Sequence, residues 1–242
     1  MIDHTLDLAA VEEATERLLG AVAALDNAAV AAPSRLPGWS RGHVLAHLAR
    51  NADALVNVLE GRPMYADEAT RDADIERDAA RPLPVHLADV RDSAARFRET
   101  AATPADWSRV ITMRNGVTDT AARLPFRRLA EVELHHVDLG IGRSLEDLPE
   151  EFTGREIDFL VERFAGHPAV PPLELAAPDG RRWRTGRAAG AGEGASEGGG
   201  TEESAPLAVS GPAPELMGWL AGRRDGAGLI HQGADLPVLP PL

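Results

Sequence analysis

The segment RRLAEVELHHVDLG, at residues 127–140, holds two glutamates and two adjacent histidines within six residues. On an α-helix, residues four apart lie about 40° apart around the axis and residues three apart about 60°, so either spacing can direct two side chains to one point. Glu131 with His135 fits the first spacing, and Glu133 with His136 fits the second. A carboxylate and an imidazole on one helical face can hold a metal ion when another helix supplies a further nitrogen. Helix geometry alone leaves both pairs open.

The further nitrogen is available in LPGWSRGHVLAHLARNADAL, at residues 36–55, where His43 and His47 are four residues apart. The apolar residues of this segment form one helical stripe; His47 lies near its edge, and His43 points further toward solvent. Asn51 falls on the same side as His47. We therefore expect His47 to be the better ligand, although histidines and glutamates in helices are more often surface or core groups than ligands.

Apolar residues at spacings of three and four predict the helices that must position these side chains. The first covers residues 5–30, and the second lies between an N-cap at Ser40 and a stop at Gly61. A third follows Pro84, and the segment that holds the two glutamates forms the fourth, with Pro125 tolerated in its first turn. Four such helices predict a bundle whose core is open to a built-in site.

The second half of the chain has a different pattern. Thr153 and Glu156 have the spacing of a capping box at the start of a helix. LELAAPDGRRWR, at residues 173–184, predicts a strand, a turn and a strand. PLAVSG, at residues 206–211, predicts another strand, and residues 212–222 a short helix. These elements indicate a small α+β unit.

The run GRAAGAGEGASEGGGTEES, at residues 186–204, has little to bury and predicts a mobile loop. The fold class is therefore predicted as α+β. An N-terminal four-helix bundle would occupy residues 1–148, and a small C-terminal α/β domain with the loop would occupy residues 149–242.

The composition excludes several classes of function. With 38 acidic and 25 basic residues, the formal net charge of −13 has the wrong sign for binding phosphate backbones, so we expect no nucleic-acid partner. The sequence has neither a long apolar run nor a signal-peptide pattern, which favours a cytoplasmic protein with no membrane partner. The chain has no cysteine, so any thiol chemistry must use a thiol from outside.

Several segments together carry a family resemblance. LPGWSRGHVLAHLARNADAL, PMYADEATRDADI and RRLAEVELHHVDLG occur in this order, and LAVSGPAPELMGWLAGR follows near the C-terminus. In these segments the chain resembles the mycothiol-dependent maleylpyruvate isomerase family, whose N-terminal part is a DinB-like four-helix bundle. The resemblance spans most of the chain.

The resemblance implies a site. It places a divalent metal, usually zinc, on His47, Glu131 and His135, and so selects one of the two helical pairs. It also places Arg71 in the active site as a catalytic residue. By its sequence context alone, Arg71 is one charge in the solvated run DEATRDADIERD.

The chemistry implied by the resemblance uses mycothiol as a cofactor. A thiol on a divalent metal loses its proton and can attack as a thiolate. Its addition to maleylpyruvate, rotation about the former double bond and expulsion of the thiol yield fumarylpyruvate, a step of aromatic catabolism through gentisate. Arg71 would hold a substrate carboxylate or stabilise the enolate. The expected partners are a small thiol and a small anionic keto acid, and the expected state is a monomer.

Two alternatives stay open. A zinc-dependent mycothiol S-transferase would use the same device but keep the thiol on its product. A metal-stabilised binding or regulatory module without turnover would need a fourth protein ligand, for which His43 or His136 is available. Asp138 either orients a ligand or lies at the surface. Arg127 and Arg128 could attract an anionic substrate or face water, and we expect them to face water.

Overall fold

The computed structural model describes residues 3–103, 106–185, 206–232 and 235–240 of the 242-residue chain. These residues form two compact units, Met1–Ser144 and Leu145–Leu242. The mobile loop predicted for residues 186–204 lies outside the described residues. No helix in the described ranges is both long enough and apolar enough to span a membrane.

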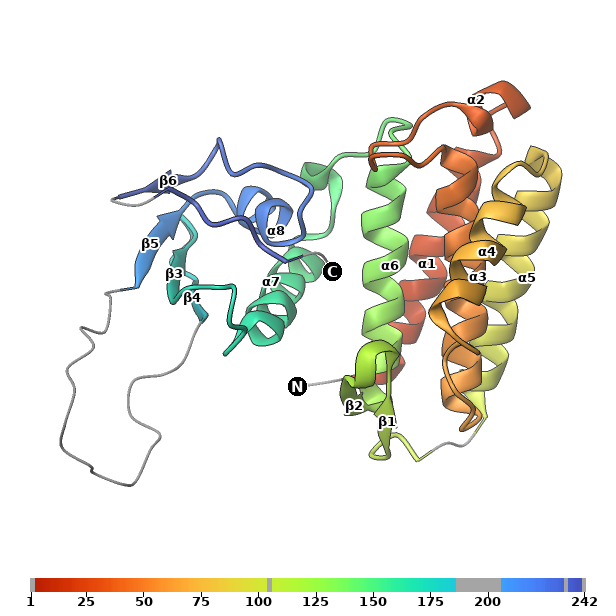
Figure 1. Ribbon diagram of the computed structural model, residues 1–242, viewed down its shortest axis with the longest axis horizontal. Coiled ribbons are helices and arrows are strands. Elements are labelled where there is room, and N and C mark those ends of the chain that lie inside the picture. The colour runs from red at the N-terminus through yellow and green to blue at the C-terminus, as the bar shows by residue number, and fades with distance from the viewer. Residues whose placement is uncertain (1–2, 104–105, 186–205, 233–234, 241–242) are drawn as a thin grey trace. The chain divides into compact units, whose positions relative to one another are not determined.

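Unit 1 is a helical bundle (Figure 1). Its helices are α1 (His4–Val22), α2 (Asn27–Ala31), α3 (Arg41–Leu59), α4 (Glu68–Ala79), α5 (Leu83–Ala102) and α6 (Leu124–Asp138). Helix α3 packs against α4, α5 and α6, and α1 packs against α5 and α6. Their apolar faces form the core, which confirms the bundle predicted from the periodicity.

The ends of α3 are those that its sequence predicts. The hydroxyl of Ser40 accepts a hydrogen bond from the backbone N–H of His43, and the ring Nδ1 of His43 accepts one from the backbone N–H of Ser40 at 3.1 Å. This reciprocal pair satisfies two backbone donors that a helix start leaves without helical partners. After the last turn, Gly61 adopts a φ of +79°, which glycine tolerates without steric cost.

One helix prediction for unit 1 was wrong, and one helix was not predicted. The single helix over residues 5–30 is broken, because α1 ends at Val22 and the side chain of Asp26 starts α2 by accepting from the N–H of Ala29 at 2.7 Å. The run of charges around Arg71 is not merely solvated, since it forms α4 and buries Ile75 against the bundle.

A small hairpin connects α5 to α6. Strands β1 (Val110–Thr112) and β2 (Thr118–Thr120) pair antiparallel, with a 3₁₀ turn η1 (Arg114–Gly116) between them. A second 3₁₀ turn, η2 (Ala121–Arg123), leads directly into α6. The hairpin therefore fixes where α6 begins.

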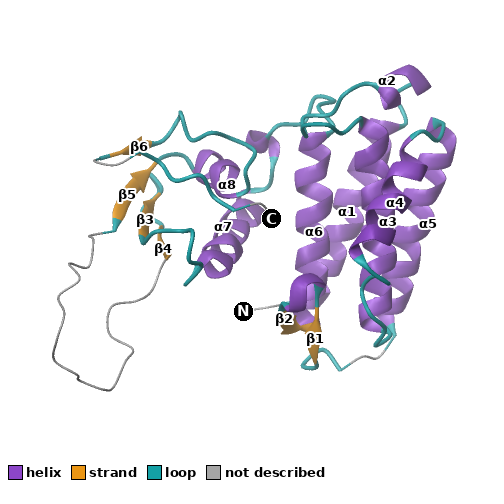
Figure 2. Ribbon diagram, in the orientation of Figure 1, coloured by secondary structure: helices purple, strands orange, loops and turns teal. Residues whose placement is uncertain are grey.

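Unit 2 contains a four-stranded sheet, which gives the whole chain the predicted α+β class (Figure 2). Its elements are η3 (Leu145–Asp147), α7 (Glu150–Phe164), β3 (Leu173–Ala176), β4 (Arg182–Thr185), β5 (Leu207–Ser210), α8 (Ala213–Leu220) and β6 (Ile230–His231). The strand order is β4-β3-β5-β6, with β3 and β5 parallel and the other pairs antiparallel. Helix α7 packs against α8 and β4.

The capping box predicted at Thr153 was wrong. Helix α7 begins three residues earlier, at Glu150, after Pro149. Thr153 lies inside its first turn, where its hydroxyl donates to the carbonyl of Pro149 at 3.1 Å. A threonine hydroxyl can bond to a backbone carbonyl four residues back, so the residue type alone does not fix the helix start.

Two helical glycines should respond oppositely to substitution by alanine. A Cβ at Gly42 would lie 2.1 Å from the carbonyl oxygen of Ala79, so Gly42→Ala must push α3 away from the end of α4. We expect it to lower the free energy of unfolding by about 1–3 kcal/mol. A Cβ at Gly20 meets nothing within 4 Å, so Gly20→Ala should raise this free energy by about 0.5–1 kcal/mol. Urea denaturation measures both changes, and equal stability of the two variants would contradict the contact.

Candidate metal centre

The packing of α3 against α6 brings together the three predicted ligands. The Oε2 atom of Glu131 lies 2.9 Å from Nε2 of His47 and 3.2 Å from Nε2 of His135. The two imidazole rings meet edge to face, with centroids 4.6 Å apart. One candidate ligand atom from each residue lies within 4.8 Å of the other two. Two nitrogens and a carboxylate oxygen therefore converge on one point.

The other helical pair does not join this cluster. The two oxygens of Glu133 accept hydrogen bonds from Arg17 at 2.7 Å and from Arg143 at 2.8 Å. His136 is buried, and desolvation lowers its pKa to about 4. Because α6 is buried on more than one side, Glu133, His135 and His136 are all buried and Glu131 is partly exposed. Only Glu131 and His135 face a histidine of α3.

His47 is in the protonation state that a metal ligand needs. It is buried, and desolvation lowers its pKa to about 4 despite the opposing hydrogen bond to Glu131, so the ring is neutral at neutral pH. Its Nδ1 accepts a hydrogen bond from Nη2 of Arg71 at 3.2 Å. The Trp39 ring lies beside it, with a centroid distance of 5.6 Å.

Asp138 orients the second histidine. Its Oδ2 lies 2.9 Å from Nδ1 of His135, and the carboxylate is buried, not at the surface. Burial lowers the pKa of His135, but the bonds to Asp138 and Glu131 outweigh it, and the pKa is raised. A carboxylate that accepts from Nδ1–H leaves the Nε2 lone pair for the cluster, as in many carboxylate–histidine–metal arrangements.

Glu131 supplies the negative charge. Desolvation raises its pKa, but the hydrogen bonds to His135 and His47 prevail and hold the pKa well below its ordinary value. The carboxylate is therefore ionised at neutral pH. Two histidines and one glutamate form a donor set that suits zinc in open, catalytic sites. The residues present thus fit a divalent metal ion.

Arg71 reaches the cluster from α4. Its Nη2 donates to His47, its Nη1 donates to Asp72 at 2.6 Å, and its guanidinium lies 5.9 Å from the centre of the Tyr65 ring. The predicted active-site arginine therefore contacts one of the three predicted ligands, and all four side chains form one cluster.

The expectation that Arg127 and Arg128 face water was wrong. Arg127 donates to Asp119 through two nitrogens, at 2.9 and 2.6 Å. Arg128 is only 1% exposed and donates to the carbonyl of Leu48 and the side chain of Asn51. Its spacing of three residues from Glu131, on the same helical face, was the available signal in the sequence.

His43 is also held elsewhere. Its Nδ1 takes part in the cap at Ser40, and its Nε2 lies 3.1 Å from Glu76. It is therefore not a fourth member of the cluster in the described structure.

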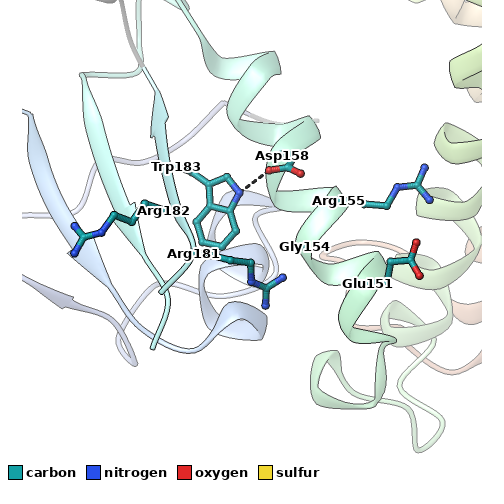
Figure 3. A pocket seen from close by; sticks show the side chains of 7 residues that line it. All are labelled: Glu151, Gly154, Arg155, Asp158, Arg181, Arg182 and Trp183. Atoms are coloured by element: carbon teal, nitrogen blue, oxygen red, sulfur yellow. Dashed lines mark hydrogen bonds between the residues drawn. The ribbon is translucent and has the colours of Figure 1, made fainter. Parts of the chain in front are cut away.

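Unit 2 has a surface hollow between α7 and β4 (Figure 3). The indole N–H of Trp183 donates to Asp158 at 2.6 Å, and Arg181 donates to Asp179 at 2.8 Å. These polar groups are satisfied by neighbours on the same surface. Nothing in the hollow resembles the convergence of ligand atoms in unit 1.

Two family descriptions match the chain. Residues 11–140 match the mycothiol maleylpyruvate isomerase N-terminal domain. Residues 147–241 match the C-terminal domain of the same family. Together they span most of the sequence. A comparison with curated proteins gives no match.

Two solved structures share the fold. They are crystal structures of the mycothiol-dependent maleylpyruvate isomerase and of a histidine-to-alanine mutant of that enzyme. The sequence identities are 23% and 22%, and each TM-score is 0.84. In both cases the match covers 99% of this chain and 97% of the other. At this level of identity, the likeness establishes the fold.

The two glutamates of α6 should be separable by experiment. Glu131→Gln removes a charged ligand and should weaken zinc binding by at least about 100-fold, with a small change in stability. Glu133→Gln removes the charge that pairs with Arg17 and Arg143, and should lower the free energy of unfolding by about 1–3 kcal/mol while zinc affinity stays close to that of the unsubstituted protein. Calorimetric zinc titration and urea denaturation measure the two effects. Equal losses of zinc affinity would contradict the assignment.

Asp138→Asn should affect the metal centre through His135. The amide cannot hold the Nδ1 proton of the ring as a carboxylate does, so we expect zinc affinity to fall about 10-fold to 100-fold. Ser93→Ala serves as the control, because it removes a buried polar group of α5 that lies outside the cluster. The role of Asp138 would be refuted by zinc affinity equal to that of the control.

Proposed function

The chain belongs to the mycothiol maleylpyruvate isomerase family, and on this premise we propose that it converts maleylpyruvate to fumarylpyruvate with mycothiol as its thiol cofactor. The observation that carries the proposal is the convergence of His47, Glu131 and His135 with Arg71 beside them. The chain has no cysteine of its own, which is consistent with a thiol supplied from outside.

We assign His47, Glu131 and His135 as the ligands of a divalent metal, zinc. A divalent ion held by these three residues would have room for an outside ligand, and would supply the chemistry that lowers the pKa of a bound thiol. A binding module without turnover would need a closed site. His43 and His136 are engaged or enclosed elsewhere, which supports an open one.

Arg71 is assigned to the substrate. A histidine that gives Nε2 to a metal keeps its proton on Nδ1, and this nitrogen can then no longer accept from Arg71. The guanidinium becomes available to bind a substrate carboxylate through two N–H groups. Metal ligation by His47 and substrate binding by Arg71 are therefore compatible within one site.

The proposed reaction uses a thiolate and a nearby guanidinium. The thiolate adds to the cis carbon–carbon double bond that is conjugated to the keto group, and the electron pair moves to the keto oxygen as an enolate. The former double bond is then single and can rotate. Collapse of the enolate restores the double bond in the trans geometry and expels the thiolate. A guanidinium near the enolate oxygen would stabilise its charge during both steps.

A spectroscopic assay tests the function. The zinc-loaded protein is mixed with maleylpyruvate, with and without mycothiol, and the absorbance of maleylpyruvate is followed for the unsubstituted chain and for His47→Ala. We expect isomerisation only with mycothiol and only with His47. Equal rates without thiol would refute the proposal. Mass analysis that finds a stable thiol adduct in place of fumarylpyruvate would identify an S-transferase.

Arg71→Met should lower kcat/KM for maleylpyruvate by about 10²–10³, because the site loses a charged donor to substrate and enolate. Arg71→Lys should recover part of the loss, since it keeps the charge but not the two-pronged geometry. Arg98→Met, at an exposed arginine of α5, is the control and should leave kcat/KM unchanged. Zinc content should be equal in all three variants. An unaltered kcat/KM in Arg71→Met would exclude Arg71 from the site.

A further inference from the structure

Arg128 is a neighbour of two of the candidate metal ligands on α6. It precedes Glu131 by three residues and His135 by seven, so all three side chains leave α6 on the same face. It is among the largest side chains of the protein that are fully buried. A buried charge close to a metal site must affect every ion that binds there.

Only part of its hydrogen-bonding capacity is used. Nη1 donates to the carbonyl of Leu48 and to Oδ1 of Asn51, both at 2.8 Å. Within the described residues, Nε and Nη2 are buried and have no hydrogen-bond partner. Both acceptors are uncharged groups of α3, one and four residues beyond His47. The contacts therefore fix the side chain without neutralising it.

Two other buried charges in the same bundle, those of Glu133 and Asp78, are neutralised. Glu133 is bound by two arginines, and the buried carboxylate of Asp78 is bound by Arg50, Arg77 and Arg81. Among the described residues, no carboxylate forms an ion pair with Arg128. The carboxylate whose charge acts most strongly on Arg128 is that of Glu131, which already bonds to two histidines. Burial lowers the pKa of Arg128 to about 10, so it is still charged at neutral pH.

We propose that Arg128 is a positioning residue that supplies an unpaired positive charge near the metal centre and so makes the bound metal favour anionic ligands. The inference rests on the metal site of the proposed function, and concerns a residue without assigned ligand contact. Arg128 acts through space, by the interaction of its charge with Glu131 and with the bound ion. Its charge should raise the affinity of the centre for a thiolate or a carboxylate. The same charge must repel the metal ion and lower its affinity.

The opposite effects of the charge on anion affinity and on metal affinity distinguish an electrostatic role of Arg128 from a structural one. If Arg128 only held α3 to α6, its loss would distort the cluster and weaken metal and anion binding together. If its charge is what matters, removal of that charge tightens metal binding and weakens anion binding. Charges separated by a few ångströms of protein interior interact strongly enough for changes of about tenfold.

The experiment uses Co²⁺ as the metal and azide as the anion. Co²⁺ affinity is measured by competition with a chelator, and azide affinity by the change in the visible absorption of the Co²⁺-loaded protein. Asn51→Asp is the sharpest variant, because it keeps the size of the side chain and its acceptor oxygen but pairs Arg128 with a carboxylate. Arg128→Met removes the charge, and Arg128→Lys keeps it. Arg127→Met is the control, since Asp119 already neutralises Arg127.

We expect Asn51→Asp and Arg128→Met to bind Co²⁺ about tenfold more tightly and azide about tenfold more weakly. Arg128→Lys and Arg127→Met should stay near the unsubstituted protein. If Arg128→Met does not fold, Asn51→Asp decides the question. Parallel losses of both affinities, or no change in azide affinity, would overturn the inference. Neither measurement uses mycothiol or maleylpyruvate, so absence of isomerase activity would refute the proposed function and leave this result standing.

Discussion

The contact between α3 and α6 is the interaction on which the candidate site depends, because each helix supplies only part of the cluster. His47 faces Glu131 and Asn51 faces Arg128, so the helices run antiparallel. Two arginines hold this register by donating to backbone carbonyls of the opposite helix. Arg41 of α3 bonds to Leu139 just beyond the end of α6, at 2.7 Å, and Arg128 of α6 bonds to Leu48 of α3, at 2.8 Å. The ligands lie between these clamps, so a slip of either helix would break both clamps and disperse the cluster.

The two glutamates of α6 show how environment assigns a role to a residue type. Both lie within a few residues of His135 and His136 in the sequence, and both are on a helix most of whose residues are buried. Glu133 accepts hydrogen bonds from two arginines, which neutralise its charge. These bonds connect α6 to α1 and to the segment that follows α6. Glu131 meets two imidazoles that are metal-binding groups themselves. One carboxylate is therefore committed to structure, while the other can accept a cation.

How much the sequence could predict differs from residue to residue. Ser40 and Gly61 act locally, so the ends of α3 could be predicted. The choice between Glu131 and Glu133 could not be made from spacing, because it depends on which helix packs against each face of α6; only the family resemblance selected Glu131. Helix α4 was missed because few of its residues are apolar, and its burial depends on α3. The burial of Arg128 was missed because neighbouring residues of a helix point about 100° apart, and a pair of arginines does not reveal which one turns inward.

The charge of the whole chain and the charge of the site act over different distances. Ions in solution screen exposed charges beyond about 8–10 Å, so the formal −13 of the chain governs its encounters with large polyanions. Inside the bundle such screening is weak, and the cluster experiences mainly the carboxylates of Glu131 and Asp138 and the guanidinium groups of Arg71 and Arg128. If Glu131 binds a divalent cation as proposed, the positive charges of the cation and the two arginines exceed the negative charges of the two carboxylates. An acidic protein can therefore contain a site that favours small anions, because the sign of its net charge bears only on the partners that meet its surface.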